Sequence, residues 1–110
     1  MKKKNRIRKG MEFQELIHKG KKFVNSSFVL YTLDKKEEQT RIGISLSKKI
    51  GNAVHRNLYK RQLRMMCEEL VDFHTCQKDI ILIVRFGYLN LSYAENKNNL
   101  EKVFRKATIM

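Results

Sequence analysis

The sequence contains no proline, no tryptophan and only two cysteines in 110 residues. Without proline, its turns depend on Gly, Asn, Asp and Ser, and no proline-rich linker divides the chain. Two cysteines are too few for a small disulfide scaffold, so we expect free thiols in a reducing compartment. A zinc site formed by Cys67, His74 and Cys76 is disfavoured, because it lacks a fourth ligand and the standard ligand spacing.

Long hydrophobic runs are also absent. The longest, Ile80 to Val84, is far shorter than the roughly 18–20 residues that a membrane span needs. The N-terminus, MKKKNRIRKG, is followed by no apolar stretch of the kind found in a secretory signal. Hydrophobic residues still make up 42% of the chain, which is enough for a core. We predict a cytoplasmic protein without a membrane partner, with a basic arm over residues 1–9 and a single domain over residues 10–110.

Acidic residues are scarce relative to basic ones. The chain carries 24 Lys and Arg against 11 Asp and Glu, a formal net charge of +13. No acidic residue occurs between Gln39 and Cys67, whereas Lys and Arg occur seven times in that interval. An excess of this kind indicates a polyanionic partner, and nucleic acid is the first candidate. If about seven basic residues contact phosphates, affinity should fall with salt with a log–log slope near −5 to −6.

Hydrophobic periodicity predicts a small α+β protein. Helices are expected over residues 11–18, 52–73 and 92–106, and strands over residues 23–33, 41–47 and 78–85. In the second strand Ile42, Ile44 and Leu46 share one face, which leaves a polar face that is open to a ligand. The order α-β-β-α-β-α predicts a two-layer α/β sandwich, with helices packed on a small, mostly antiparallel sheet.

The segment over residues 52–73 is the longest periodic one. Asn52 is a good helix N-cap, and a 3.6-residue period separates an apolar face from a basic face. The predicted apolar face comprises Val54, Leu58, Tyr59, Leu63, Met65, Met66, Leu70 and Phe73. The basic face comprises Arg56, Lys60, Arg61 and Arg64, three of them at i, i+4 and i+8 and so about 6 Å apart. Such a row matches the scale of phosphate spacing along a nucleic-acid strand.

Aromatic side chains are the second feature of a single-strand site, because exposed rings stack on unpaired bases. Phe13 and Tyr31 are candidates, whereas Phe28 is expected in the core because its strand is apolar on both faces. Catalytic patterns are missing: there is no P-loop and no GxGxxG, and adjacent glutamates on a helix do not face each other. The residues alone therefore favour a binding protein over a free-standing nuclease.

Residues 47–64, S-K-K-I-G-N-A-V-H-R-N-L-Y-K-R-Q-L-R, closely resemble a known signature, K-x-G-N-A-V-x-R-N-R-x-K-R, of the bacterial ribonuclease P protein component. The opening E-F-Q, the segments FVLYTLD and RIGISLS, and the closing VFRK also resemble that family, so the likeness spans nearly the whole chain. The resemblance implies an α/β sandwich with an unusual left-handed βαβ crossover. It also implies a subunit of an RNA-based endonuclease that cuts the 5′ leader from precursor tRNA.

The resemblance further implies partners, ions and site residues. The chain would join the catalytic RNA as a monomer and bind precursor tRNA; it would hold no cofactor alone, with Mg²⁺ expected in the holoenzyme. Contacts to the catalytic RNA carry over to Lys48, Lys49, Asn52, Arg56, Asn57, Lys60, Arg61 and Arg64. The leader cleft carries over to Phe13, Ile17 and Tyr31, with further basic contacts from Arg6 and Lys9. Ile17 stands where an aromatic is common, and Leu58 stands where the family usually has Arg.

Two other binding functions are compatible with the charge. One is a general RNA-binding or ribosome-associated protein, which would bind structured RNAs and stimulate no cleavage. The other is a DNA-binding protein that inserts the helix over residues 52–73 into a major groove. The second is disfavoured, because no neighbouring helix in the sequence completes a helix-turn-helix.

Overall fold

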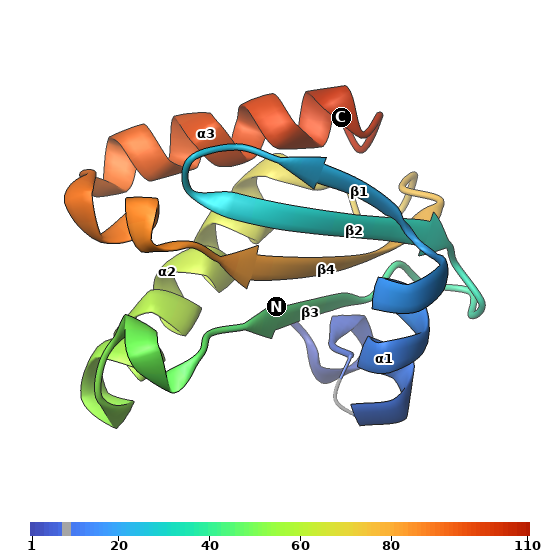
Figure 1. Ribbon diagram of the computed structural model, residues 1–110. Helices are drawn as coiled ribbons and strands as arrows, with labels where there is room; N and C mark the ends of the chain where they lie inside the picture. Colours follow the sequence, from blue (N-terminus) through green and yellow to red (C-terminus); the bar gives the residue numbers. More distant parts are fainter. Residues whose placement is uncertain (8–9) are drawn as a thin grey trace.

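Four strands form one mixed sheet in the computed structural model, which describes residues 1–7 and 10–110 (Figure 1). The strands are β1 (Lys21–Val24), β2 (Phe28–Asp34), β3 (Ile42–Ser45) and β4 (Lys78–Val84), and they lie in the order β1-β2-β4-β3. β4 pairs antiparallel with β2 and parallel with β3. The strand predicted over residues 78–85 is therefore confirmed, and its nearly continuous apolar run is central and buried.

Three α-helices and three short 3₁₀ helices complete the fold. The α-helices are α1 (Gly10–Lys19), α2 (Ala53–Leu70) and α3 (Tyr93–Lys106); the 3₁₀ helices are η1 (Lys3–Asn5), η2 (Lys48–Ile50) and η3 (Phe86–Asn90). Local sequence explains where two of them begin. The predicted cap Asn52 accepts a hydrogen bond from the backbone N–H of His55, and Ser92 forms a reciprocal capping box with Glu95.

The connection from β3 through α2 to β4 joins two adjacent parallel strands. In Figure 1 the chain leaves β3, passes behind the sheet as α2 and returns in β4. This is the left-handed sense that the resemblance implies, and it is rare because about 98% of such connections are right-handed.

The main core lies between the sheet and the helices α2 and α3. It includes Phe28, Leu63, Met66, Leu100 and Phe104, all of which are fully buried. Phe28 is thus confirmed as a core residue. The apolar side chains of α3 and its C-terminal cap, Leu100, Val103, Phe104 and Ala107, are buried as well.

The opposite face of the sheet is covered only in part. α1 lies against it at one end (Figure 1). There, Leu16 and Ile7 pack on Ile81. Phe13, Tyr31, Leu33 and Ile83 border this smaller cluster and remain partly exposed. The expected open face is therefore shared between α1 and solvent.

The prediction of one strand over residues 23–33 is wrong. The structure has a hairpin here, because Asn25 accepts hydrogen bonds from the backbone N–H groups of Ser27 and Phe28 and so closes a turn between β1 and β2. The observed order is α-β-β-β-α-β-α. The loop after Asp34 joins strands of opposite direction, and β4 lies between them.

The N-terminal segment also differs from the exposed arm that its charge predicts. Asn5 and Ile7 are buried; the side-chain amide of Asn5 donates to the carbonyl of Thr40, and the backbone N–H of Ile7 donates to the carbonyl of Ile42. Apolar Ile7 and amide-bearing Asn5 interrupt the run of cations, and these two residues bind the segment to the edge of β3. Lys9 lies outside the described residues.

No helix in the described part of the chain is both long and apolar enough to cross a membrane.

Candidate nucleic-acid interface

The exposed side of α2, together with η2, carries the predicted basic residues. We call this surface the basic face; it comprises Lys48, Lys49, Asn52, Arg56, Asn57, Lys60, Arg61 and Arg64. Five of its members are fully exposed, and Arg56, Lys60 and Arg64 are half-buried. The last three follow one another at successive turns of the helix, so they form the continuous row that the sequence predicts.

Several cations elsewhere in the molecule pair with nearby carboxylates. Lys36 pairs with Glu15, Lys97 pairs with Glu69, and the Nζ of Lys78 lies 2.6 Å from Asp34, which lowers the pKa of that carboxyl group. On the basic face, five cations form no ion pair within residues 1–7 and 10–110: Lys48, Lys49, Arg56, Lys60 and Arg61. A row of like charges costs a few tenths of a kcal/mol per pair, which an anion bound to it would offset.

Arg56 is the clearest example of a basic-face cation that forms no ion pair among the described residues. Its Nε is buried and finds no hydrogen-bond partner among the described residues. A buried donor without a partner is unfavourable, since its lost hydration is not replaced. A phosphate oxygen is a natural partner for a guanidinium group, which binds it through two parallel hydrogen bonds.

The predicted apolar face of α2 is wrong at one edge. Leu63, Met66 and Cys67 are buried, but Val54 and Met65 are 75% and 50% exposed. Leu58 is exposed as well, at 40%. The predicted face covered about half the helix circumference, whereas a helix that packs on a sheet buries a narrower stripe. Val54, Leu58 and Met65 lie outside the buried stripe, beside Arg61 on the helix.

The second predicted surface, which we call the cleft, lies between α1 and the sheet. Phe13 of α1 and Tyr31 of β2 are both half-buried and pack on the same small cluster around Ile81. Ile17, one turn after Phe13, is 37% exposed and is not part of this cluster. The structure therefore brings Phe13 and Tyr31 together and leaves a part of each ring accessible.

Gly43 of β3 determines how closely the Phe13 ring can approach the sheet. This glycine was not predicted as a site residue from the sequence. A Cβ at this position would lie 2.5 Å from the Cζ of Phe13, so the ring rests directly on the glycine backbone. A glycine inside a strand often marks such a close approach, and this signal could have identified it.

α1 is held in place by a buried ionic cluster. The guanidinium of Arg41 lies 2.9 Å from Glu12 of α1 and 3.2 Å from Asp79 of β4. Burial by itself would lower the pKa of Arg41, but hydrogen bonds to Asp79 and Glu12 outweigh it and raise the pKa. Because Glu12 precedes Phe13, this cluster also orients the cleft. Arg41 is one of the basic residues counted in the sequence. Its partners Glu12 and Asp79 are distant from it in the chain, so these ion pairs were not predicted.

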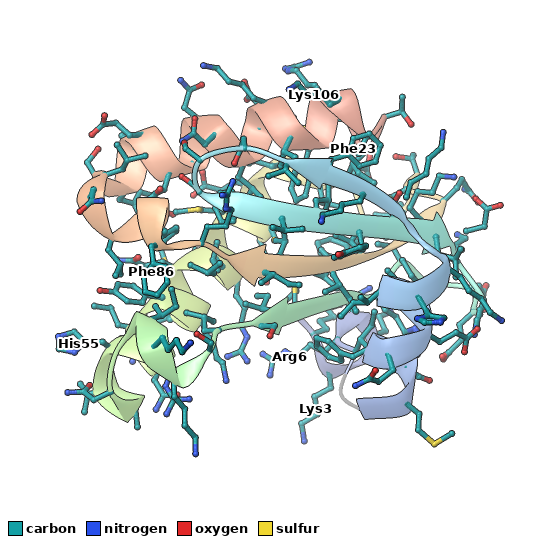
Figure 2. The ribbon with its side chains drawn as sticks, in the orientation of Figure 1. Lys3, Arg6, Phe23, His55, Phe86 and Lys106 are labelled. Carbon is teal, nitrogen blue, oxygen red and sulfur yellow. The ribbon has the colours of Figure 1, made fainter. Side chains whose placement is uncertain are left out.

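The two surfaces meet at the open edge of β3. A pocket of about 350 Å³ is lined there by Arg6, Phe13, Lys60 and Arg64, with Ile7, Ile42 and Ile44 among its apolar walls. Figure 2 shows Arg6 in the space between α1 and α2. Residues from the N-terminal segment, α1 and α2 thus form one cationic site with an aromatic wall, which suits a phosphate and an adjoining base.

The cysteines contribute no chemistry to these surfaces. Cys67 and Cys76 are free and buried, and burial raises the pKa of the Cys67 thiol to about 12. Within residues 1–7 and 10–110, no three His, Cys, Asp or Glu side chains are grouped so that they could hold a metal ion.

Comparison with known proteins assigns a family. The Ribonuclease P family matches residues 1–108. A ribonuclease P protein component from Bacillus cereus strain AH187 is 47% identical over 108 residues, which cover 97% of this chain and 94% of that protein. Among solved structures, a Staphylococcus aureus RNase P protein mutant with defective mRNA degradation activity superposes with a TM-score of 0.89 at 38% identity, over 98% of this chain and 92% of that one.

A more distant structure supports the fold alone. The RNase P protein from Thermotoga maritima superposes with a TM-score of 0.75 at 23% identity, and the match covers 91% of this chain and 96% of that one. The α+β architecture is thus shared across sequences that differ at most positions.

Proposed function

The chain belongs to the family of ribonuclease P protein components, and from this premise we propose how its two surfaces act on two RNAs. As a member, it is the protein subunit of a ribonucleoprotein endoribonuclease, with a role in 5′ maturation of tRNA, and it associates with ribonuclease P RNA. In our proposal, the basic face binds the phosphates of that catalytic RNA, and the cleft binds the single-stranded leader of precursor tRNA.

The observation that carries this proposal is the junction of the two surfaces. Lys60 and Arg64 of the basic face line a pocket whose wall is Phe13. Phosphate contacts position an RNA without reading its sequence, and aromatic rings stack on bases of any identity. Such a surface can hold many precursor tRNAs, whose leaders differ, beside one fixed catalytic RNA. Binding one RNA at each surface raises their effective concentration for each other.

Mg²⁺ belongs to the holoenzyme in this proposal, because the described residues of the two surfaces do not fit a site for it. Magnesium prefers carboxylate and other oxygen ligands, whereas both proposed RNA surfaces are lined by cations and apolar groups. We therefore assign the chain the binding and orientation of RNA, as one copy per catalytic RNA in the cytoplasm, and derive no step through the metal.

Cleavage of precursor tRNA by a bacterial ribonuclease P RNA at low Mg²⁺, with and without the chain, tests this proposal. We expect strong stimulation by the wild type and loss of it in the double variant Arg56→Ala/Lys60→Ala. RNA binding should weaken, and the log–log salt slope should flatten by about 2, because two phosphate contacts are lost.

The double variant Lys102→Ala/Lys106→Ala is the matched control. It removes two exposed cations at the same i, i+4 spacing from α3, on a different surface of the molecule (Figure 2). We expect it to keep stimulation and slope. Equal losses in both variants would show that only net charge matters, and tight binding of unrelated RNAs without stimulation would favour the general RNA-binding alternative.

A further inference from the structure

The outer edge of β1 is open to a further strand. β1 is the last strand of the sheet and pairs only with β2, whereas the edge of β3 is paired with the N-terminal segment. The backbone N–H of Asn25 donates to the carbonyl of Phe28, and hydrogen-bonded pairs alternate from there along the hairpin. The N–H and C=O groups of Lys22 and Val24 therefore point away from β2, and no backbone group within residues 1–7 and 10–110 bonds to them.

Positive charge lies along this edge and on the helix beside it. Figure 1 shows α3 alongside β1, and the side-chain amide of Asn25, just after β1, donates to the carbonyl of Asn99 in α3 at 2.8 Å. Four lysines of the two elements are exposed and form no ion pair within the described residues: Lys21, Lys22, Lys102 and Lys106. With Val24, which is 43% exposed, we call these four lysines the edge site.

A pocket of about 290 Å³ lies where the end of β1 meets α3. Its lining consists of Asn25, Asn99, Lys102, Val103, Arg105 and Lys106, so no carboxylate among the described residues lines it. The edge site therefore offers two kinds of contact side by side: free backbone groups on β1 and cations on α3. None of its residues belongs to the basic face or the cleft, so its role is separate from the two proposed RNA surfaces.

We propose that the edge site docks an acidic polypeptide segment, which adds to the sheet as a further strand beside β1. The backbone of an extended segment satisfies the free groups of Lys22 and Val24, and its carboxylates pair with the lysines. An RNA strand has no alternating N–H and C=O groups to match such an edge. A second copy of the chain would set Lys21 and Lys22 against the same lysines, which is unfavourable. Lysines on an edge strand deter that pairing, but they attract a strand of opposite charge.

The test measures binding of a synthetic peptide of alternating glutamate and valine, about six residues long, to the full chain. We expect saturable binding by fluorescence anisotropy, with shifts of the backbone amide resonances of Lys22 and Val24 in NMR spectra. A peptide of alternating lysine and valine is the control for charge, and it should not bind.

Variants of the chain separate the two kinds of contact. Val24→Pro removes an outward N–H without removing a hydrogen bond to β2, and should weaken peptide binding by about 2- to 12-fold. Val24→Ala retains the N–H and is its matched control. Lys102→Ala/Lys106→Ala should weaken binding by about 2- to 30-fold, the loss of two exposed ion pairs, and leave precursor tRNA cleavage stimulated. Arg56→Ala/Lys60→Ala removes the same charge from the basic face and should keep the affinity for the peptide. Thermal unfolding of each variant checks the fold.

Four results would overturn the inference. Equal losses in the two double variants would show that the peptide responds only to net charge. No binding, or binding without shifts at Lys22 and Val24, would show that the lysines of β1 serve only to keep the edge unpaired. A single-stranded RNA oligonucleotide that shifts the same resonances and binds more tightly than the peptide would assign the surface to RNA. A dimer in sedimentation that Val24→Pro abolishes would assign it to a second copy of the chain.

Discussion

The two faces of the sheet differ in how completely they are covered. The face toward α2 and α3 carries Phe28, Leu30 and Ile42, each of which exposes 1% or less of its surface. The face toward α1 carries Tyr31 and Ile83, which remain half-buried. The first face provides stability, and the second leaves apolar and aromatic surface accessible. A small domain can therefore keep one side of its sheet for binding when two helices seal the other.

Removing a ring from the sealed face should have the largest effect. Phe104 of α3 is fully buried in the main core. Phe104→Ala should lower the free energy of unfolding by about 3–5 kcal/mol, through lost burial and the cavity left behind. Denaturant unfolding measures this loss. A loss well under 1 kcal/mol would show that the contrast between the two faces is overstated.

Removing a ring from the open face should instead reduce binding. Tyr31→Ala should weaken binding of leader-containing precursor tRNA by about 1–3 kcal/mol, the value of one base–aromatic stack. The loss of unfolding free energy should be smaller than for Phe104→Ala, because Tyr31 is only half-buried. Equilibrium binding and denaturant unfolding are compared on the same preparation, with Tyr31→Phe as the variant that retains the ring. A loss of stability without a loss of affinity would contradict the proposed cleft.

Adding a cation beside the basic face should have the smallest effect. Leu58 is 40% exposed on α2, so a longer side chain can extend into solvent. Leu58→Arg should tighten RNA binding modestly and steepen the log–log salt slope by about 1, because it adds one phosphate contact. Repulsion from nearby cations reduces the gain by a few tenths of a kcal/mol. Leu58→Gln is the uncharged control, and affinity that is unchanged or weaker at fixed salt would count against the prediction.

The basic face could be predicted almost completely from sequence, because its residues lie in η2 and on one regular helix. Periodicity alone places Arg56, Lys60 and Arg64 in a row, and the structure confirms that row. The cleft could be predicted only through the resemblance. Phe13 and Tyr31 belong to different elements, and no local pattern shows that both pack around Ile81.

The misses have local physical causes as well. The hairpin at Asn25 was overlooked because the aromatic and β-branched residues on both sides favour a strand, whereas the turn depends on one side-chain amide. The exposed edge of α2 was overlooked because a helical wheel shows which residues share a side but not how much of that side the sheet covers.

By itself, the sequence determined the α+β class, a strand in the apolar run of β4, the cap of α2 and a helix face of one charge. Each of these depends on residues close together in the chain, where spacing and propensity act directly. Tertiary structure alone decided the burial of Asn5 and Ile7, the contact of Phe13 with Gly43 and the Arg41 cluster. These depend on distant segments meeting, and that meeting is set by the order of the strands and the left-handed crossover.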